Sequence, residues 1–311
     1  MSLIHCHFLR FSIKRELSEE EIDSICQQFF GFGYRNLSPL AKSRYGYGTG
    51  LTYGNVANVY ADGHGFNKGT TCFDLPGDAL KTLNVDLLEL LLFIRQQGGN
   101  VCRFDIAADD VDHVLPFDEI VRLSQGETFK RRVVTKLCRD RVKGKGTTLP
   151  EISVQPRRVQ YGSEKSDNYL IFYDKMYCSG VEYPYMRVEL RLTQRQDTKA
   201  LLDALTTPGV DFAQHLAGVI RGKLDFKETN DLNKQRAATM PWWLEFLSGA
   251  TAQKLRRAPR KRSDNPFISI EELRIEKYRR RIDKHVDALR ARNDTEALQR
   301  IGEKISNVYE F

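Results

Sequence analysis

The sequence predicts an α+β fold: a mainly antiparallel, curved sheet with flanking helices, followed by a small helical region at the C-terminus. Three segments alternate polar with apolar residues, as half-buried strands do, and they read VCRFDIAADD, NYLIFYDK and YMRVELRL. Turns join the run of strand-like segments between residues 159 and 193, which favours antiparallel pairing. Helical leucine spacing precedes the first of the three segments, and helical patterns return after residue 230. Together these patterns indicate an α+β domain followed by a helical region.

The N-terminal part of this domain begins with a predicted strand over Leu3–Lys14. Ser18 and Glu21 have the spacing of a capping box, so a helix begins there. The Gly-, Tyr- and Asn-rich stretch Gly31–Gly69 favours hairpins, and a strand follows over Thr70–Leu75. These segments supply the first strands and the first helix of the sheet domain.

The next elements are predicted from leucine spacing and from stop signals. A helix is expected over Asp78–Gln97, because its leucines recur at helical intervals and Gly98 and Gly99 follow. Composition changes near residue 230, and a long helix is expected after Ser269. We therefore predict an α+β domain over residues 1–230 and a basic helical region over residues 231–311.

Composition limits the classes of protein to which the chain can belong. Of its 311 residues, 48 are Lys or Arg and 41 are Asp or Glu, so the net charge of +7 is compatible with a polyanionic partner. None of the six cysteines forms a C-x-x-C pair, which argues against a structural zinc site. Arg10, Lys14 and Arg15 are not typical of a signal peptide, and no apolar run is long enough to cross a bilayer. We expect a cytoplasmic protein without a membrane partner.

The polar faces of the three strand-like segments carry residue types that chemistry uses. With a period of two, the residues that share a face are Arg103, Asp105 and Asp109 on the first segment, Tyr169, Tyr173 and Lys175 on the second, and Arg187, Glu189 and Arg191 on the third. Carboxylates favour Mg²⁺ or Mn²⁺, a tyrosine hydroxyl can attack phosphorus, and Arg or Lys neutralises phosphate charge. The pattern suits metal-assisted attack of a tyrosine on a phosphodiester, although a solvated sheet face gives the same alternation.

The order of these motifs resembles a known family. VCRFDIAADD, then VQYGSEKSDNYLIFYDK, then MRVELRL are similar to the successive motifs of the Rep_trans replication initiation factors, and GTTCFDLPGDAL is similar to their N-terminal pattern. The similarity spans about Tyr45–Thr193. It implies a nicking-endonuclease-like fold in residues 1–230 and an enzyme that nicks and joins DNA to initiate rolling-circle replication. The enzyme would become linked to a 5′ phosphate through a tyrosine and leave a 3′ hydroxyl for a polymerase.

The resemblance also implies roles for individual residues. Tyr173 matches the nucleophile, and Tyr169, Tyr161 and Tyr177 are the fallbacks. Asp105 and Glu189 match the acids that bind Mg²⁺ or Mn²⁺. The catalytic cations would be Arg103, Lys175 and Arg187. One departure is Ile171, where the family often has arginine, so Lys165 or Arg187 is expected to replace that phosphate clamp.

Basic residues outside the strands predict further contacts with DNA. The expected DNA-binding residues are Arg191, Lys254, Arg256, Arg257, Arg260, Lys261 and Arg262. A solvated linker is the alternative for the stretch Lys254–Arg262. The expected partners are origin DNA, as duplex and as single strand, together with a host helicase and polymerase; homodimerisation stays open.

Other functions fit parts of the same pattern. A conjugative relaxase would use the same chemistry, a regulator could bind origin DNA without cutting it, and an RNA-binding protein could use the same basic surface. His5 and His7 share a face, as metal-binding histidines on a strand do, but at the extreme N-terminus a pair of surface or core histidines is the preferred interpretation.

Overall fold

The computed structural model describes residues 3–54, 56–77, 79–135, 137, 149–154, 157–163, 166–176, 185–228, 231, 233–253, 255, 286, 289–290 and 294–306. The chain divides into two compact units, Met1–Arg257 and Ala258–Phe311. The second unit contains helix α11 (Thr295–Ser306). The functional boundary near residue 230 stays a prediction, and nearly all of the helix expected after Ser269 lies outside the described residues.

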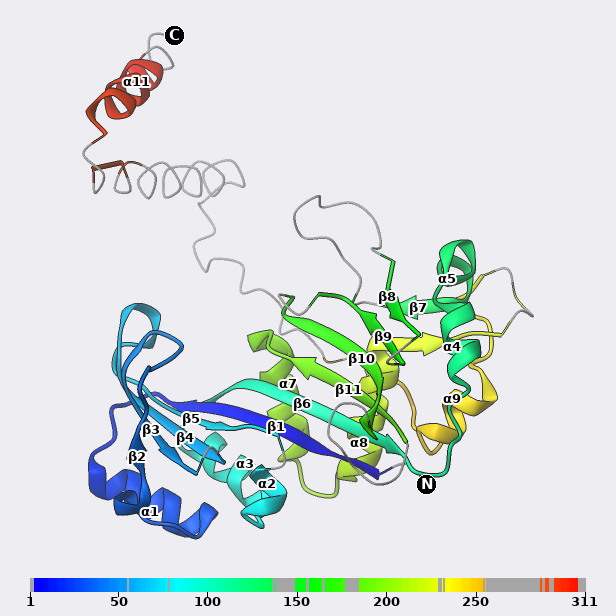
Figure 1. The fold of residues 1–311 in the computed structure, drawn as a ribbon, viewed down its shortest axis with the longest axis horizontal. Helices are drawn as coiled ribbons and strands as arrows, with labels where there is room; N and C mark the ends of the chain where they lie inside the picture. Colours follow the sequence, from blue (N-terminus) through cyan, green and yellow to red (C-terminus); the bar gives the residue numbers. More distant parts are fainter. Residues whose placement is uncertain are drawn as a thin grey trace. The chain divides into compact units, whose positions relative to one another are not determined.

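Within the described residues, ten antiparallel strands form one sheet in the order β2-β3-β4-β5-β1-β6-β11-β10-β9-β8 (Figure 1). Their bounds are β1 Leu3–Ile13, β2 Ser38–Pro39, β3 Tyr47–Tyr53, β4 Ala57–Gly63, β5 Thr71–Leu75, β6 Asn100–Asp110, β8 Glu151–Ser153, β9 Arg158–Tyr161, β10 Asn168–Asp174 and β11 Met186–Leu192. A separate ribbon pairs β7 (Val133–Thr135) with β12 (Leu224–Phe226). The expected α+β fold with a mainly antiparallel sheet is confirmed.

Helices cover the apolar face of this sheet. The helical segments of unit 1 are α1 Glu19–Phe30, η1 Tyr34–Asn36, η2 Gly65–Asn67, α2 Ala79–Thr82, α3 Leu87–Gln96, α4 Phe117–Leu123, α5 Gly126–Arg132, α7 Arg195–Leu205, α8 Phe212–Lys223 and α9 Pro241–Phe246. Apolar residues at alternate positions of β6 and β11, such as Ile106 and Leu190, are fully buried in one core with residues of α3, α7 and α8. The opposite face of the strands therefore keeps the polar residues.

The prediction of one continuous helix over Asp78–Gln97 is wrong. The chain forms α2 and α3 instead, and Asn84 between them has a left-handed backbone with φ 50°. Asp86 then caps α3, because its side chain accepts a hydrogen bond from the backbone N–H of Glu89 at 2.9 Å. The leucine spacing continues through residues 80–91, but the left-handed Asn84 and the cap at Asp86 divide the segment into two helices.

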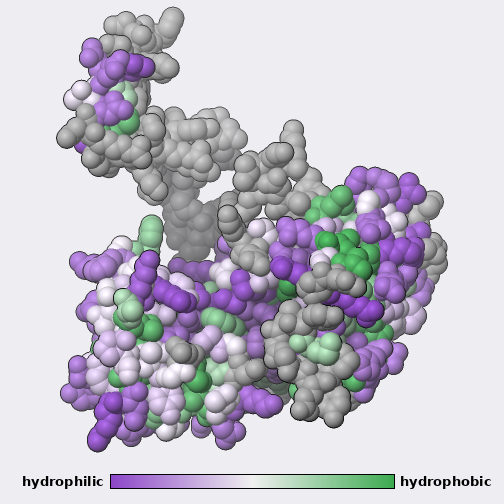
Figure 2. All heavy atoms as spheres, in the orientation of Figure 1, coloured by the Kyte–Doolittle hydropathy of each residue, from purple (hydrophilic) through white to green (hydrophobic). Residues whose placement is uncertain are grey.

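The segment after residue 230 contributes to the core of unit 1. Trp243 of α9 is fully buried, and its ring lies 5.8 Å from that of Phe172 and 5.3 Å from that of Phe226. The visible surface of unit 1 is mostly hydrophilic, with hydrophobic residues gathered in a few places (Figure 2). No helix among the described residues is both long and apolar enough to cross a membrane.

Candidate active site on the polar face of the sheet

Strand register brings the three predicted segments together on one face of the sheet. Tyr173 of β10 pairs with Arg187 of β11, which pairs with Asp109 of β6. Four residues along the strands, Tyr169 pairs with Arg191, which pairs with Asp105, and Glu189 of β11 lies midway between the two rows. Residues that pair across neighbouring strands project from the same face. The structure therefore gathers the residues of the predicted polar face.

Tyr173 and Glu189 form a direct contact at this face. The hydroxyl of Tyr173 donates a hydrogen bond to Oε2 of Glu189 over 3.1 Å, and both side chains are part-buried. Burial and the charge of Glu189 raise the pKa of Tyr173, while Arg187 opposes that rise. The hydroxyl thus stays protonated near neutral pH, and the nearby carboxylate is placed to accept its proton.

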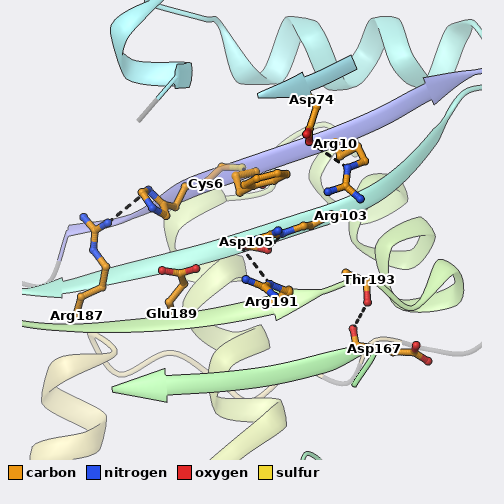
Figure 3. Close-up of polar contacts among 12 residues, drawn as sticks. Cys6, Arg10, Asp74, Arg103, Asp105, Asp167, Arg187, Glu189, Arg191 and Thr193 are labelled. Carbon is orange, nitrogen blue, oxygen red and sulfur yellow. Dashed lines mark hydrogen bonds and ion pairs between the residues drawn. The ribbon is translucent and has the colours of Figure 1, made fainter. Parts of the chain in front are cut away.

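Arg187 is held in a buried ion pair. Its Nε and Nη2 donate to the two carboxylate oxygens of Asp109 at 2.5 and 2.8 Å, and Arg187 is 4% exposed. Its Nη1 also lies 3.4 Å from Nδ1 of His7 on β1 (Figure 3). Both ends of the guanidinium fork are therefore engaged, so Arg187 is better placed to position its neighbours than to hold a phosphate. The sequence had singled out Asp109 without finding this partner.

Asp105 is the most enclosed residue of the face. Its side chain is fully buried, it accepts hydrogen bonds from Nε of Arg103 at 2.9 and 3.1 Å, and Nε of Arg191 lies 3.6 Å from its Oδ2 (Figure 3). Burial raises the pKa of Asp105, while Arg103 opposes that rise. Asp105 thus fixes two of the predicted cations side by side.

The donor set partly fits the expected divalent cation. Within the described residues, no three His, Cys, Asp or Glu side chains gather as a metal cluster. Mg²⁺ often binds to one or two protein carboxylates and completes its shell with water and substrate phosphate, which suits the part-buried Glu189. Asp105 carries the right oxygens on the neighbouring strand, but it could share an ion with Glu189 only if the bond to Arg103 opened.

The remaining predicted residues differ in their surroundings. Lys175 is buried just beyond the end of β10. Tyr169 is 6% exposed, with the guanidinium of Arg191 4.4 Å from its ring centre. Tyr161 lies in the hydrophobic core and is fully buried, so it is remote from the polar face. Tyr177 and Lys165 lie outside the described residues, as do Lys254, Arg256, Arg257, Arg260, Lys261 and Arg262.

Two cations near this face were missed by the sequence reasoning. Arg158 of β9 pairs with Tyr173 in the strand register, which places it on the same face and makes it a candidate for the phosphate clamp lost at Ile171. Arg10 of β1 pairs with Arg103 in the same way. The signal for Arg158 was the alternation RVQY before the second motif, but only register shows which strand lies beside Tyr173.

A family model described as replication initiation factor (Rep_trans) matches residues 99–266, which is more than half of the chain. The chain belongs to this family. The match includes the strands that carry Asp105, Tyr173 and Glu189. The resemblance that the motifs suggested is thus confirmed.

Two further comparisons identify similar proteins. The chain is 25% identical over 175 residues to "Putative DNA relaxase NicK" of Bacillus subtilis (strain 168), covering 53% of this chain and 48% of that protein. The chain thus spans about half the length of this curated relative. Its fold is similar to that of a rolling circle replication initiator protein from Geobacillus stearothermophilus, with a TM-score of 0.62, 17% identity, and coverage of 83% of this chain and all of the other. The structural similarity confirms the nicking-initiator-like fold.

Proposed function

We propose that this chain nicks and joins DNA to initiate rolling-circle replication, with Tyr173 as the nucleophile. The observation that carries the proposal is the 3.1 Å hydrogen bond from the hydroxyl of Tyr173 to Glu189, on a sheet face that also holds Arg103 and Arg191. Membership of the replication initiation factor family supports the same activity.

The proposed reaction transfers one phosphodiester bond. Oη of Tyr173 attacks the phosphorus, Glu189 accepts the phenolic proton, and an O–P bond forms. The bond from phosphorus to the 3′ oxygen breaks, and that oxygen leaves with the electron pair and gains a proton. The products are a 5′-phosphotyrosyl enzyme and a free 3′ hydroxyl, which a polymerase can extend. The reverse reaction joins the strand.

The cations of the face neutralise the phosphate in this proposal. Arg103 and Arg191 lie beside Asp105, Arg158 pairs with Tyr173 in the strand register, and Lys175 follows directly after β10. Glu189, together with Asp105 once its bond to Arg103 opens, would hold a Mg²⁺ or Mn²⁺ ion, which would polarise the phosphate oxygens. Origin DNA, a host helicase and a polymerase are the proposed partners.

Cleavage of a supercoiled plasmid tests this function. The plasmid carries the DNA that flanks the coding sequence of the chain, and Mg²⁺ or Mn²⁺ is added. We expect nicked circles with protein bound to one end, and neither product with EDTA or with Asp105→Ala or Glu189→Ala. Tyr173→Phe should abolish the covalent product, whereas Tyr169→Phe should keep it. A covalent product from folded Tyr173→Phe would move the nucleophile to another residue.

A conjugative relaxase is the second candidate, because a relative of the chain is named as a DNA relaxase. The chemistry would be the same and the biological outcome different. Replication of a small plasmid that depends on Tyr173 supports the initiator, whereas Tyr173-dependent transfer between cells without such replication supports the relaxase. A wild-type chain that binds the flanking DNA and never cuts it would instead be a regulator.

A further inference from the structure

The connection between β4 and β5 carries a bare aromatic side chain. Phe66, in the 3-10 turn η2, is 108% exposed, so its ring touches almost nothing else in the described structure. Single exposed hydrophobic residues are common and need no explanation by themselves. The surroundings of Phe66 make it unusual, because they hold its turn firmly and carry positive charge.

Hydrogen bonds brace the turn on both sides of Phe66. The backbone N–H of His64 donates to the carbonyl of Gly46 at 2.8 Å, and Nδ2 of Asn67 donates to the carbonyl of Tyr45 at 2.6 Å. Gly63 allows the chain to close this tightly, because a Cβ there would lie 1.8 Å from the carbonyl oxygen of Asn67. The turn is therefore fixed to the neighbouring 44–47 segment, with the phenyl ring projecting outward.

The segment that supports the turn has an unusual backbone. Tyr45 adopts φ 58°, a left-handed conformation that bulky residues rarely accept. Such backbones persist where the surroundings impose them, and they cluster at functional sites. Here the guanidinium of Arg10 lies 3.7 Å from the ring centre of Tyr45, and its Nη2 donates to the tyrosine hydroxyl at 2.8 Å.

Contacts link this support to the candidate active site. Arg10 pairs in register with Arg103, and Arg103 stacks on Phe8 with its Cζ 3.7 Å from the ring centre. Arg103 in turn binds Asp105, beside Arg191 (Figure 3). Three strand spacings separate β1 from β10, about 14 Å at the usual distance between strands. A row of guanidinium groups thus runs across the sheet from Phe66's support to the strands that hold Tyr173.

The charged residues around Phe66 indicate which class of molecule would bind there. The exposed charged residues of the supporting segments are Lys42, Arg44, Lys68 and Asp62. Three are positive and one is negative, and the large hydrophobic residues of these segments that are exposed are Tyr45 and Phe66. A protein partner that buried Phe66 would prefer a wider apolar patch. Cations around a single projecting ring suit a DNA duplex, whose phosphates pair with the cations while the ring enters the base stack.

We propose that Phe66 is a wedge that inserts between base pairs of the duplex beside the nicking site. The insertion unstacks the duplex, so that the strand to be cut can lie along the guanidinium row and reach Tyr173. This inference rests on the proposed nicking function, because it names how that site obtains single-stranded substrate from a duplex.

The test compares Phe66→Ala with the wild-type chain on two DNAs. One is the supercoiled plasmid described above, and the other is a set of overlapping single-stranded oligonucleotides that together cover both strands of its insert. We expect Phe66→Ala to lower the plasmid nicking rate at least tenfold more than the oligonucleotide cleavage rate. The extent of permanganate oxidation of unpaired thymines beside the nick in the plasmid should also be lower with Phe66→Ala than with the wild-type chain. Phe66→Trp should keep the wild-type plasmid nicking rate and the wild-type permanganate reactivity, because a larger ring can still stack between base pairs.

A matched control is Leu88→Ala, since Leu88 is 47% exposed on α3, which covers the opposite face of the sheet. It should leave the ratio of the two rates at the wild-type value. If Phe66→Ala keeps that ratio as well, or changes only the oligomeric state in sedimentation, the wedge is wrong while the nicking function stands. Wild-type cleavage of the single strand without any cleavage of the plasmid also overturns the wedge. Absence of wild-type cleavage on both DNAs refutes the function itself.

Discussion

At the scale of single residues, the account depends on how the environment of Tyr173 controls a proton. Burial and the carboxylate of Glu189 raise the pKa of the phenol, so attack requires a base. The hydrogen bond to Oε2 of Glu189 identifies that base. Alternation along the strands predicted that Tyr173, Glu189 and Asp105 share a face. Alternation did not predict the ion pair between Asp109 and Arg187, because strand order and register depend on distant parts of the chain.

Replacing Glu189 with Gln tests whether Glu189 is the base that accepts the proton of the nucleophile Tyr173. We expect oligonucleotide cleavage near pH 7.5 to fall about 100-fold, because no carboxylate accepts the proton. Glu189 also raises the pKa of Tyr173, so Tyr173 loses its proton at a lower pH in the variant than in the wild type. In the variant this proton passes to a base in the solvent. The rate of the variant should therefore rise about tenfold per pH unit between pH 7 and 9.

Measured pH–rate profiles check this, with Glu151→Gln, an exposed carboxylate on β8, as the control that should keep the wild-type profile. A Glu189→Gln profile with the same slope and height as the wild type would show that Glu189 is not the base.

At the scale of elements, local signals predicted where some elements begin, but the sequence analysis missed one helix break and one tertiary contact. The capping box of Ser18 and Glu21 was predicted and is present at the start of α1. The break between α2 and α3 was not, since leucine spacing continues across it and a left-handed Asn84 leaves no periodic signal. Helix α8 illustrates a tertiary contact that sequence spacing cannot show, because its two glycines pack against residues more than thirty positions later.

Gly222 of α8 gives the test at this scale. A Cβ at this position would lie 1.8 Å from the carbonyl oxygen of Gln253, and the backbone N–H of Gln253 donates to the carbonyl of Gly218 at 2.7 Å. Alanine normally stabilises a helix relative to glycine by roughly 0.5–1 kcal/mol. Here the clash should reverse the sign, so Gly222→Ala should lower the free energy of unfolding by about 1–3 kcal/mol. Urea denaturation measures the change, and a stabilised variant would show that the 250–253 segment does not dock on α8.

At the scale of the whole molecule, the sequence predicted the fold class and the sharing of a polar face. It did not predict that one sheet of ten described strands would join the Gly-rich N-terminal hairpins to the motif strands through β1. That joining places Phe66 and the motif residues in one unit, which no local pattern could indicate. We also propose that the basic stretch Lys254–Arg262 contributes to DNA binding, a role separate from cleavage.

Charge removal tests that role. Changing Lys254, Arg256, Arg257, Arg260, Lys261 and Arg262 to Gln should weaken binding to a duplex carrying the mapped nick site. The slope of log K against log salt should fall in magnitude by up to about five units, because up to six phosphate contacts are lost. Fluorescence anisotropy at several salt concentrations measures both, with oligonucleotide cleavage as the control for an intact sheet domain. An unchanged slope would make the stretch a linker.

The most direct test of the central claim is to identify the residue that becomes bonded to DNA. The wild-type chain is incubated with Mg²⁺ and the oligonucleotide that spans its nick site, then digested with nuclease and trypsin, and the peptides are sequenced by mass spectrometry. The account predicts a nucleotide attached to the oxygen of Tyr173. A nucleotide on Tyr169 or on any other residue, or cleavage without any covalently modified peptide, would contradict it.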